Sequence, residues 1–268
     1  MRIRIDHTSH YRYDPPVRRV VQSHRLIPAE CANQRVEQWQ VTVPGGTAGG
    51  AFTDGAGDQV QGWTIAGPVS EVVVRVQGVV ETTDCAGVLR GHRERVPPVA
   101  WLGATPATAA DAALADLARS VAAPDGLALA HALCDAVGNA IAYRPGVTHA
   151  HTTAAESLAL GEGVCQDHAH ALIACAHLRD MPARYVSGYL QANEDGSPHE
   201  AAHAWAEIWV EGLGWVGFDA SNGCCPDERY VRLGCGFDAR EAAPIRGVAL
   251  GQTVESLDVT VAVEAAQQ

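Results

Sequence analysis

One cysteine in this sequence stands where a cysteine nucleophile is readily activated. Cys165 follows the turn residues Gly161 and Gly163 and precedes a segment, 169–176, in which apolar residues recur at the spacing of one buried helical face. It would therefore occupy the first turn of a helix, where unpaired backbone N–H groups and the positive end of the helix dipole favour an anion. Such a position favours a reactive thiolate, and the same N–H groups can hold a developing oxyanion.

A cysteine nucleophile needs a histidine base, and the histidine needs a carboxylate or amide to orient it. Twelve histidines are available, but residues 203–219 narrow the choice because they predict a β-hairpin with two glycines in its turn. A turn centred near Glu211 makes His203 and Asp219 near neighbours on one face of the two strands. An imidazole beside a carboxylate on rigid strands is more basic and is fixed in orientation.

The elements that position these residues divide the chain into two predicted domains. Residues 1–98 read as an antiparallel β domain, because residues 2–5 and 38–43 alternate polar with apolar and Val96-Pro97-Pro98 marks a boundary. Residues 99–268 read as a mixed α+β domain that includes the last strand of the chain. Its helices are expected from about Ala107, from Asp125, from the capping box at Thr153 and at Cys165, and its strands at 183–191, 203–210, 215–219 and 254–263.

Composition excludes several classes of protein. The chain has 268 residues, 47% of them hydrophobic, a net charge of −12 and no lysine, so no basic stretch suggests binding to nucleic acid or to an anionic membrane. We find no export signal or membrane span and expect a cytoplasmic protein whose eight cysteines are reduced. Cys224, Cys225 and Cys235 lack the spacing of a metal site, so we expect neither metal nor cofactor.

Several motifs together resemble the transglutaminase-like superfamily, whose Cys, His and Asp lie in segments like those around Cys165, His203 and Asp219. The resemblance implies a papain-like core, in which the cysteine helix packs on an antiparallel sheet that bears the histidine and the aspartate. It also implies an N-terminal β domain like that of bacterial transglutaminase-like cysteine proteases. The motifs are Gly163-Val164-Cys165 with Asp167, His203-Ala204-Trp205, Gly214-Trp215 to Asp219, His7 to Tyr11, and Pro182 to Tyr189.

The sequence departs from the family pattern near the third motif. Ala220-Ser221-Asn222 stands where the family usually has Pro-Thr-Asn, and residues 236–239 replace a more common Gly-Arg-Asp-Tyr. Tyr230 occupies a position at which relatives often carry histidine. We interpret these differences as changes in substrate-side contacts that leave the triad intact.

Three further residues are candidates for supporting roles. Asp167 is interpreted as structural support at the start of the cysteine helix. His170 resembles a residue repeated in relatives and could orient the site, whereas His168 and His177 are expected to be structural or solvent-facing. Trp205 is expected to pack in the hairpin, with a wall of a substrate groove as the alternative.

These residues support a leading hypothesis and two alternatives. The first is an amide hydrolase or peptidase in which Cys165 forms a thioester, His203 moves protons and Asp219 holds His203. The second is a transglutaminase or peptide-modifying acyltransferase that passes the acyl group to an amine, and the third is a non-catalytic binding module. The expected partner is a peptide or protein amide; its identity, the second oxyanion donor and self-association are left open.

Overall fold

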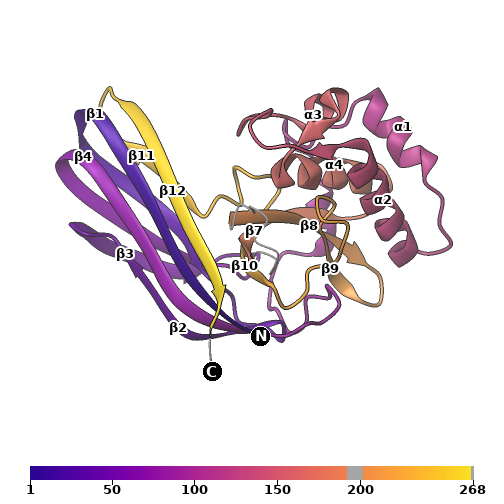
Figure 1. The fold of residues 1–268 in the computed structure, drawn as a ribbon, viewed down its shortest axis with the longest axis horizontal. Helices are drawn as coiled ribbons and strands as arrows, with labels where there is room; N and C mark the ends of the chain where they lie inside the picture. Colours follow the sequence, from indigo (N-terminus) through magenta and orange to yellow (C-terminus); the bar gives the residue numbers. More distant parts are fainter. Residues whose placement is uncertain (192–201, 267–268) are drawn as a thin grey trace.

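A computed structural model describes residues 1–191 and 202–266, which form a β domain and a mixed domain side by side (Figure 1). The β domain contains β1 (Arg2–Ile27), β2 (Gln34–Thr42), β3 (Gly46–Thr53), β4 (Gln59–Thr82), β11 (Ile245–Ala249) and β12 (Val254–Ala265). The mixed domain contains the 3₁₀ helix η1 (Pro98–Leu102), α1 (Ala112–Ser120), α2 (Gly126–Ala140), β5 (Ala142–Tyr143), α3 (Ala154–Leu160), β6 (Glu162–Gly163), α4 (Cys165–His177), β7 (Ala183–Leu190), β8 (Ala202–Val210), β9 (Gly214–Phe218) and β10 (Tyr230–Gly236). This arrangement confirms the predicted α+β class with an N-terminal β domain.

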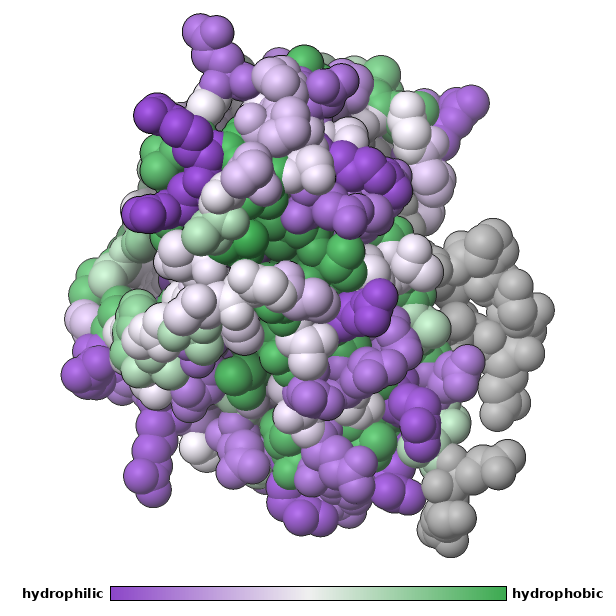
Figure 2. Space-filling model, turned by 90° about the vertical axis from the view of Figure 1, so that its left-hand side faces the viewer, coloured by the Kyte–Doolittle hydropathy of each residue, from purple (hydrophilic) through white to green (hydrophobic). Residues whose placement is uncertain are grey.

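Two long strands organise the β domain. β1 and β4 pair with each other along most of their length, and their register shifts between Arg12 and Val17. The first half of β1 also pairs with β12 and its second half with β11, while β4 pairs with β3 and then with β2. Every second residue from Ile3 to Tyr13 is buried, as expected for a strand with one face on a core. Seen from the side of this domain, hydrophobic patches lie in the middle of the face and hydrophilic side chains lie mostly around its rim (Figure 2).

The last strand differs from the prediction. The sequence analysis places residues 254–263 in a strand of the second domain, but β12 pairs with β1 from Ile3↔Ala265 to Asp14↔Val254 and so belongs to the N-terminal sheet. The physical reason is that one edge of β1 is open along this length, and the partly buried Val261 and Val263 of β12 extend the apolar core beside it. Alternation in a sequence predicts a strand but does not identify its neighbour.

The mixed domain is built around α4 and a four-stranded antiparallel sheet in the order β10-β7-β8-β9. α4 is buried on nearly all sides because it packs on β7 and β8 and is surrounded by α1, α2 and α3 (Figure 1). The predicted caps are present at Asp125 and Thr153, whereas the first helix begins at Ala112 after its cap Asp111, later than the expected start near Ala107.

The β domain contacts this sheet at β7 and at the edge strand β10. His7 of β1 is 2.8 Å from the Tyr189 hydroxyl of β7, and Gln34 of β2 exchanges hydrogen bonds with the backbone of Arg232 in β10. The face of the sheet opposite α4 carries Val186, Trp205 and Trp215, which form a separate core with Trp101 of η1 and with Ala56 between β3 and β4. No helix within residues 1–191 and 202–266 is long and apolar enough to cross a membrane.

Candidate active site

Cys165 lies at the position that the sequence predicts, as the first residue of α4. The preceding Gly161 ends α3 in the left-handed conformation with φ of 71°, and Val164 is extended. Cys165 is 7% exposed, so its thiol is largely shielded from solvent. The first backbone N–H groups of a helix have no partner within the helix, and they surround this thiol with positive partial charge.

Asp167 stabilises the turn that precedes Cys165 at the start of α4. Its buried carboxylate accepts hydrogen bonds from Val164 N at 2.8 Å and from the Thr148 hydroxyl at 2.6 Å. A Cβ atom added to Gly163 would lie 2.7 Å from the Cβ of Asp167, so this close approach requires glycine. These contacts belong to the structural role expected of Asp167.

His203 and Asp219 come together across the predicted hairpin. β8 and β9 pair from Ala206↔Phe218 to Val210↔Gly214, so the turn is centred one residue later than Glu211. The two side chains are therefore diagonal neighbours on one face of the sheet, which is within reach of long side chains. His203 Nε2 donates to Asp219 Oδ2 at 2.6 Å, and the two residues are only 8% and 1% exposed.

Cys165 completes a chain of three side chains with this pair. Burial opposes the charged imidazolium, but hydrogen bonds with Asp219 and Cys165 outweigh it and raise the pKa of His203 to about 10. Because Nε2 contacts Asp219, Nδ1 is the ring nitrogen left for the thiol. The structure thus brings Cys165, His203 and Asp219 together, with the imidazole between the thiol and the carboxylate.

Asp219 is held by more groups than the sequence analysis anticipates. Its Oδ1 accepts from Ser221 N at 3.0 Å, from the Ser221 hydroxyl at 2.6 Å and from Asn222 N at 3.2 Å. Its Oδ2 accepts from Asn222 Nδ2 at 2.7 Å and from the Tyr230 hydroxyl at 2.8 Å, besides His203. Burial disfavours the carboxylate, but the hydrogen bond and charge of His203, with those from Ser221 and Asn222, hold the pKa of Asp219 well below its usual range.

Two departures from the family pattern therefore act on the triad side of the site. The sequence analysis interprets Ser221, Asn222 and Tyr230 as substrate-side positions, but in the structure they bind the Asp219 carboxylate. Burial and the neighbouring Asp219 raise the pKa of Tyr230, which keeps its hydroxyl protonated as a donor. The Asp-Ala-Ser-Asn sequence contained a usable signal, because aspartate commonly accepts from the backbone two residues later.

His170 and Trp205 make structural contacts. His170 Nε2 accepts from Ala239 N at 3.0 Å, and burial lowers the pKa of His170 to about 4, so this ring is neutral at pH 7. Trp205 is 3% exposed, and its ring stacks beside His203 at a centroid distance of 6.4 Å and meets Tyr230 edge-on at 5.5 Å. Trp205 therefore supports the His203 ring from within the hairpin and is not an open groove wall.

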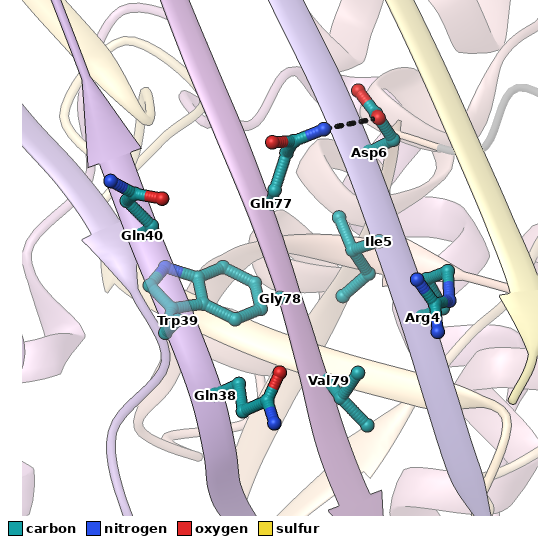
Figure 3. A pocket seen from close by; sticks show the side chains of 9 residues that line it. All are labelled: Arg4, Ile5, Asp6, Gln38, Trp39, Gln40, Gln77, Gly78 and Val79. Atoms are coloured by element: carbon teal, nitrogen blue, oxygen red, sulfur yellow. Dashed lines mark hydrogen bonds between the residues drawn. The ribbon is translucent and has the colours of Figure 1, made fainter.

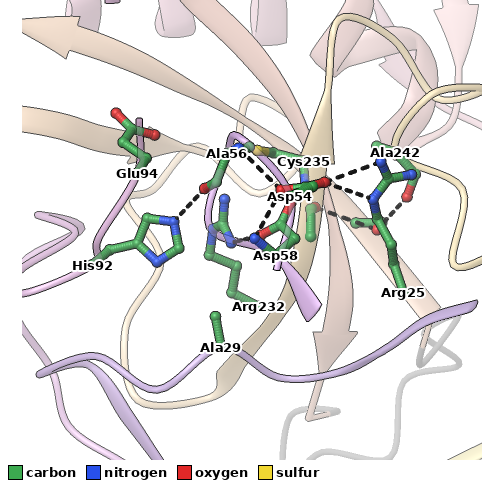
Figure 4. Close-up of polar contacts among 12 residues, drawn as sticks. Arg25, Ala29, Asp54, Ala56, Asp58, His92, Glu94, Arg232, Cys235 and Ala242 are labelled. Carbon is green, nitrogen blue, oxygen red and sulfur yellow. Dashed lines mark hydrogen bonds and ion pairs between the residues drawn. The ribbon is translucent and has the colours of Figure 1, made fainter. Parts of the chain in front are cut away.

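The face of the sheet opposite α4 carries buried charges that the sequence analysis missed. Glu207 accepts from Arg184 Nε at 2.6 Å and from Arg232 Nε at 2.9 Å. Arg232 also donates to Asp58 at 2.8 Å, and the second oxygen of Asp58 accepts from Cys235 N at 2.7 Å (Figure 4). Charged residues within three largely apolar strands were the available signal, since buried charges are normally paired.

A hollow on the β domain lies apart from the three side chains. It is formed on β1, β2 and β4, where the ring of Trp39 lies beside Gly78 and Gln77 donates to Asp6 at 2.8 Å (Figure 3). Its lining contains no cysteine or histidine. Among the residues that the structure describes, no group of three His, Cys, Asp or Glu side chains is arranged to hold a metal ion.

Two family models match this chain, and their boundaries agree with its architecture. The model of the transglutaminase-like superfamily matches residues 115–220, which contain Cys165, His203 and Asp219. The model of the bacterial transglutaminase-like N-terminal region matches residues 3–81, which span β1 to β4. Together the two models cover more than half of the chain.

Relatives extend the similarity over nearly the full length. The chain is 28% identical to an uncharacterized protein of Mycobacterium leprae, with 97% of each chain covered, and 27% identical to one of Mycobacterium tuberculosis, with 97% of this chain and 91% of that protein covered. A crystal structure from Cytophaga hutchinsonii, described as a candidate cysteine protease, has the same fold, with a TM-score of 0.76, 20% identity, and coverage of 100% of this chain and 91% of that one. The chain thus belongs to the transglutaminase-like superfamily, with a transglutaminase-like core and a bacterial transglutaminase-like N-terminal region.

Proposed function

We propose that this protein is a cysteine-dependent amide hydrolase or peptidase that works through a thioester acyl-enzyme. The observation that carries the proposal is the placement of His203 between the thiol of Cys165 and the carboxylate of Asp219, 2.6 Å from the latter. A histidine held in this way beside a cysteine at a helix start is the arrangement in which cysteine enzymes form a thiolate–imidazolium pair. Asp219 would be the orienting group, since its oxygens are fixed by five donors besides His203 Nε2.

Acylation would begin when the Cys165 thiolate attacks the carbonyl carbon of an amide. The carbonyl oxygen becomes an oxyanion, which the backbone N–H of Cys165 at the start of α4 can stabilise. The imidazolium of His203 gives its proton to the amide nitrogen as the carbon–nitrogen bond breaks. The products of this half-reaction are a free amine and a thioester on Cys165.

Deacylation would use the same residues in reverse order. Neutral His203 takes a proton from water, and the resulting hydroxide adds to the thioester carbon. Collapse of this intermediate breaks the carbon–sulfur bond, releases a carboxylic acid and restores the thiolate–imidazolium pair. Asp219 keeps its charge throughout and stabilises the imidazolium at each stage.

Thiol labelling tests the proposed pair without a known substrate. Iodoacetamide labelling followed across pH, with modified peptides located by mass spectrometry, should show Cys165 reacting at a pH below that of an ordinary thiol. His203→Ala should abolish this advantage. Cys225 is an internal comparison, because burial raises the pKa of Cys225 to about 11. Labelling spread over several thiols with ordinary pH dependence would instead favour a binding module.

Turnover distinguishes hydrolysis from acyl transfer. A peptide mixture incubated with the protein, with and without an added primary amine, should yield new carboxylic acid ends in both cases. Cys165→Ala should give no product while retaining the wild-type circular dichroism spectrum. Products that carry the added amine in place of water would identify an acyltransferase, and undiminished turnover by pure Cys165→Ala protein would refute the nucleophile.

A further inference from the structure

β12 is a long edge strand whose outer side has no partner in the described part of the chain. It pairs with β1 over twelve consecutive residue pairs without a bulge, and no other strand within residues 1–191 and 202–266 pairs with it. Figure 1 shows it running the length of the β domain beside β1. Native edge strands are usually protected by charged side chains, proline, a bulge or short length; β12 carries Glu255, Asp258 and Glu264 but is long and has neither proline nor a bulge.

The backbone groups of β12 alternate between the two sides of the strand. Ala266 N donates to Arg2 O at 2.8 Å, which shows that even-numbered residues of this segment direct their N–H and C=O groups toward β1. The odd-numbered residues from 255 to 265 therefore direct theirs outward. They form a ladder of donors and acceptors available to a further strand.

The odd-numbered residues from 257 to 265 also form an apolar stripe, next to Glu255. Their side chains share the face of Ile5, His7 and Tyr11 of β1, which lie on the core of the β domain. Val261 and Val263 are partly buried against that core, but Leu257 remains 47% exposed and Val259 50% exposed. The core of the domain thus continues onto an uncovered edge.

We propose that β12 pairs antiparallel with β12 of a second copy of this chain and forms a twofold-symmetric dimer. A twofold axis at Val259 places Val259 opposite itself and Leu257 opposite Val261, and an axis at Thr260 places Leu257 opposite Val263. Both registers join outward-facing residues to outward-facing residues, place Leu257, Val259 and Val261 opposite apolar side chains and set no carboxylate directly opposite another. Glu255 lies opposite Val263 in the first register and opposite Ala265 in the second. An axis at Asp258 would place the Asp258 side chains of the two copies directly opposite each other. Repulsion between these carboxylates disfavours that register.

Self-pairing would also cover the unpaired outer edge of β12. The resulting sheet continues from β1 and β12 of one chain into β12 and β1 of the other. The outer edge of β12 is then paired in both copies. Each copy would extend the apolar stripe of its partner and cover Leu257 and Val259. The interface lies on the β domain and uses none of Cys165, His203 or Asp219.

Sedimentation velocity over a range of protein concentrations tests this dimer in the full chain. Wild-type protein should sediment with twice the 28.2 kDa of one chain, whereas Val259→Lys should sediment as a monomer, because each lysine would lie opposite the other in the first register and opposite Val261 in the second. Ala262→Lys is the matched control: it adds the same charge to the exposed opposite face of β12, beside Asp6, and should remain dimeric. A wild-type monomer at every concentration, or a Val259→Lys dimer, would overturn the proposal.

Hydrogen exchange provides a readout that does not depend on the variant. In wild-type protein the amides of Leu257, Val259 and Val261 should exchange slowly, because in the dimer they donate to the partner strand. Their protection should decrease on dilution, while the amides of even-numbered neighbours, which face β1, stay protected. Rapid exchange of the odd-numbered amides at high concentration would place any dimer elsewhere.

Discussion

Removal of the His203 imidazole should change the pH dependence of stability in a defined window. The pKa of His203 is raised from 6.5 to about 10 because its hydrogen bonds with Asp219 and Cys165 outweigh the effect of burial. A group whose pKa is raised in the folded state stabilises that state fully below its unfolded pKa. This contribution is lost as the pH rises from about 6.5 through 10. Stability should therefore fall across this window in wild-type protein and much less in His203→Gln.

The size of the effect follows from the shift itself. Each pKa unit corresponds to about 1.4 kcal/mol, so the change from 6.5 to about 10 predicts a loss of about 3 to 6 kcal/mol. His203 is largely buried, so bulk water screens this interaction little. Buried cysteine thiols also reduce stability above pH 9, because they ionise more readily in the unfolded chain. This effect of the thiols is the same in wild type and His203→Gln, so it cancels when their unfolding free energies are subtracted.

Urea unfolding at intervals from pH 6 to pH 10 measures this difference, provided that tryptophan fluorescence and circular dichroism give coincident transitions. The gap between wild type and His203→Gln should shrink by the predicted amount as the pH rises. His151→Gln, which changes an exposed histidine, should follow the wild type at every pH. A gap that stays constant from pH 6 to pH 10 would show that His203 is not protonated in the folded protein and would refute the reasoning.

Two further substitutions test the surroundings of the site. Gly163→Ala should cost about 1 to 3 kcal/mol of unfolding free energy because its Cβ would overlap Asp167, whereas Gly126→Ala, with open space around it, should be neutral or stabilising in the same urea titration. Glu207→Gln should cost about 3 to 5 kcal/mol because it leaves two buried arginines poorly compensated, whereas Glu81→Gln, in an exposed ion pair, should cost at most about 1 kcal/mol. A Gly163→Ala protein as stable as Gly126→Ala, or equal costs for the two glutamate substitutions, would contradict these assignments.

Local patterns predicted much of the site. The glycine-rich approach to an apolar helical period located Cys165 at the start of α4, because capping and dipole effects act within one turn. Strand alternation with a short turn placed His203 and Asp219 on one face, and an error of one residue in the turn centre kept them there. Whether two residues of a hairpin lie on the same face depends only on whether the number of residues between them is odd or even. The inference therefore did not require the exact position of the turn.

Long-range partners were not predictable in the same way. The strand β12 is separated from β1 by most of the chain, and its sequence would alternate equally well beside any open edge. Glu207 lies in a segment that reads as apolar, and its two arginine partners come from different strands. Such contacts depend on sheet order, which short-range periodicity does not determine.

The strand β8 connects the candidate site to the β domain. Ala204 and Ala206 pack beneath α4, while His203, Trp205 and Glu207 share the opposite face of β8. Trp205 stacks beside His203, and Glu207 is tied through Arg232 to Asp58 of the β domain. One strand thus carries the proposed base at one end and an interdomain ion-pair network four residues away. Because packed interiors transmit strain, we expect the geometry of His203 to depend on the β domain remaining docked.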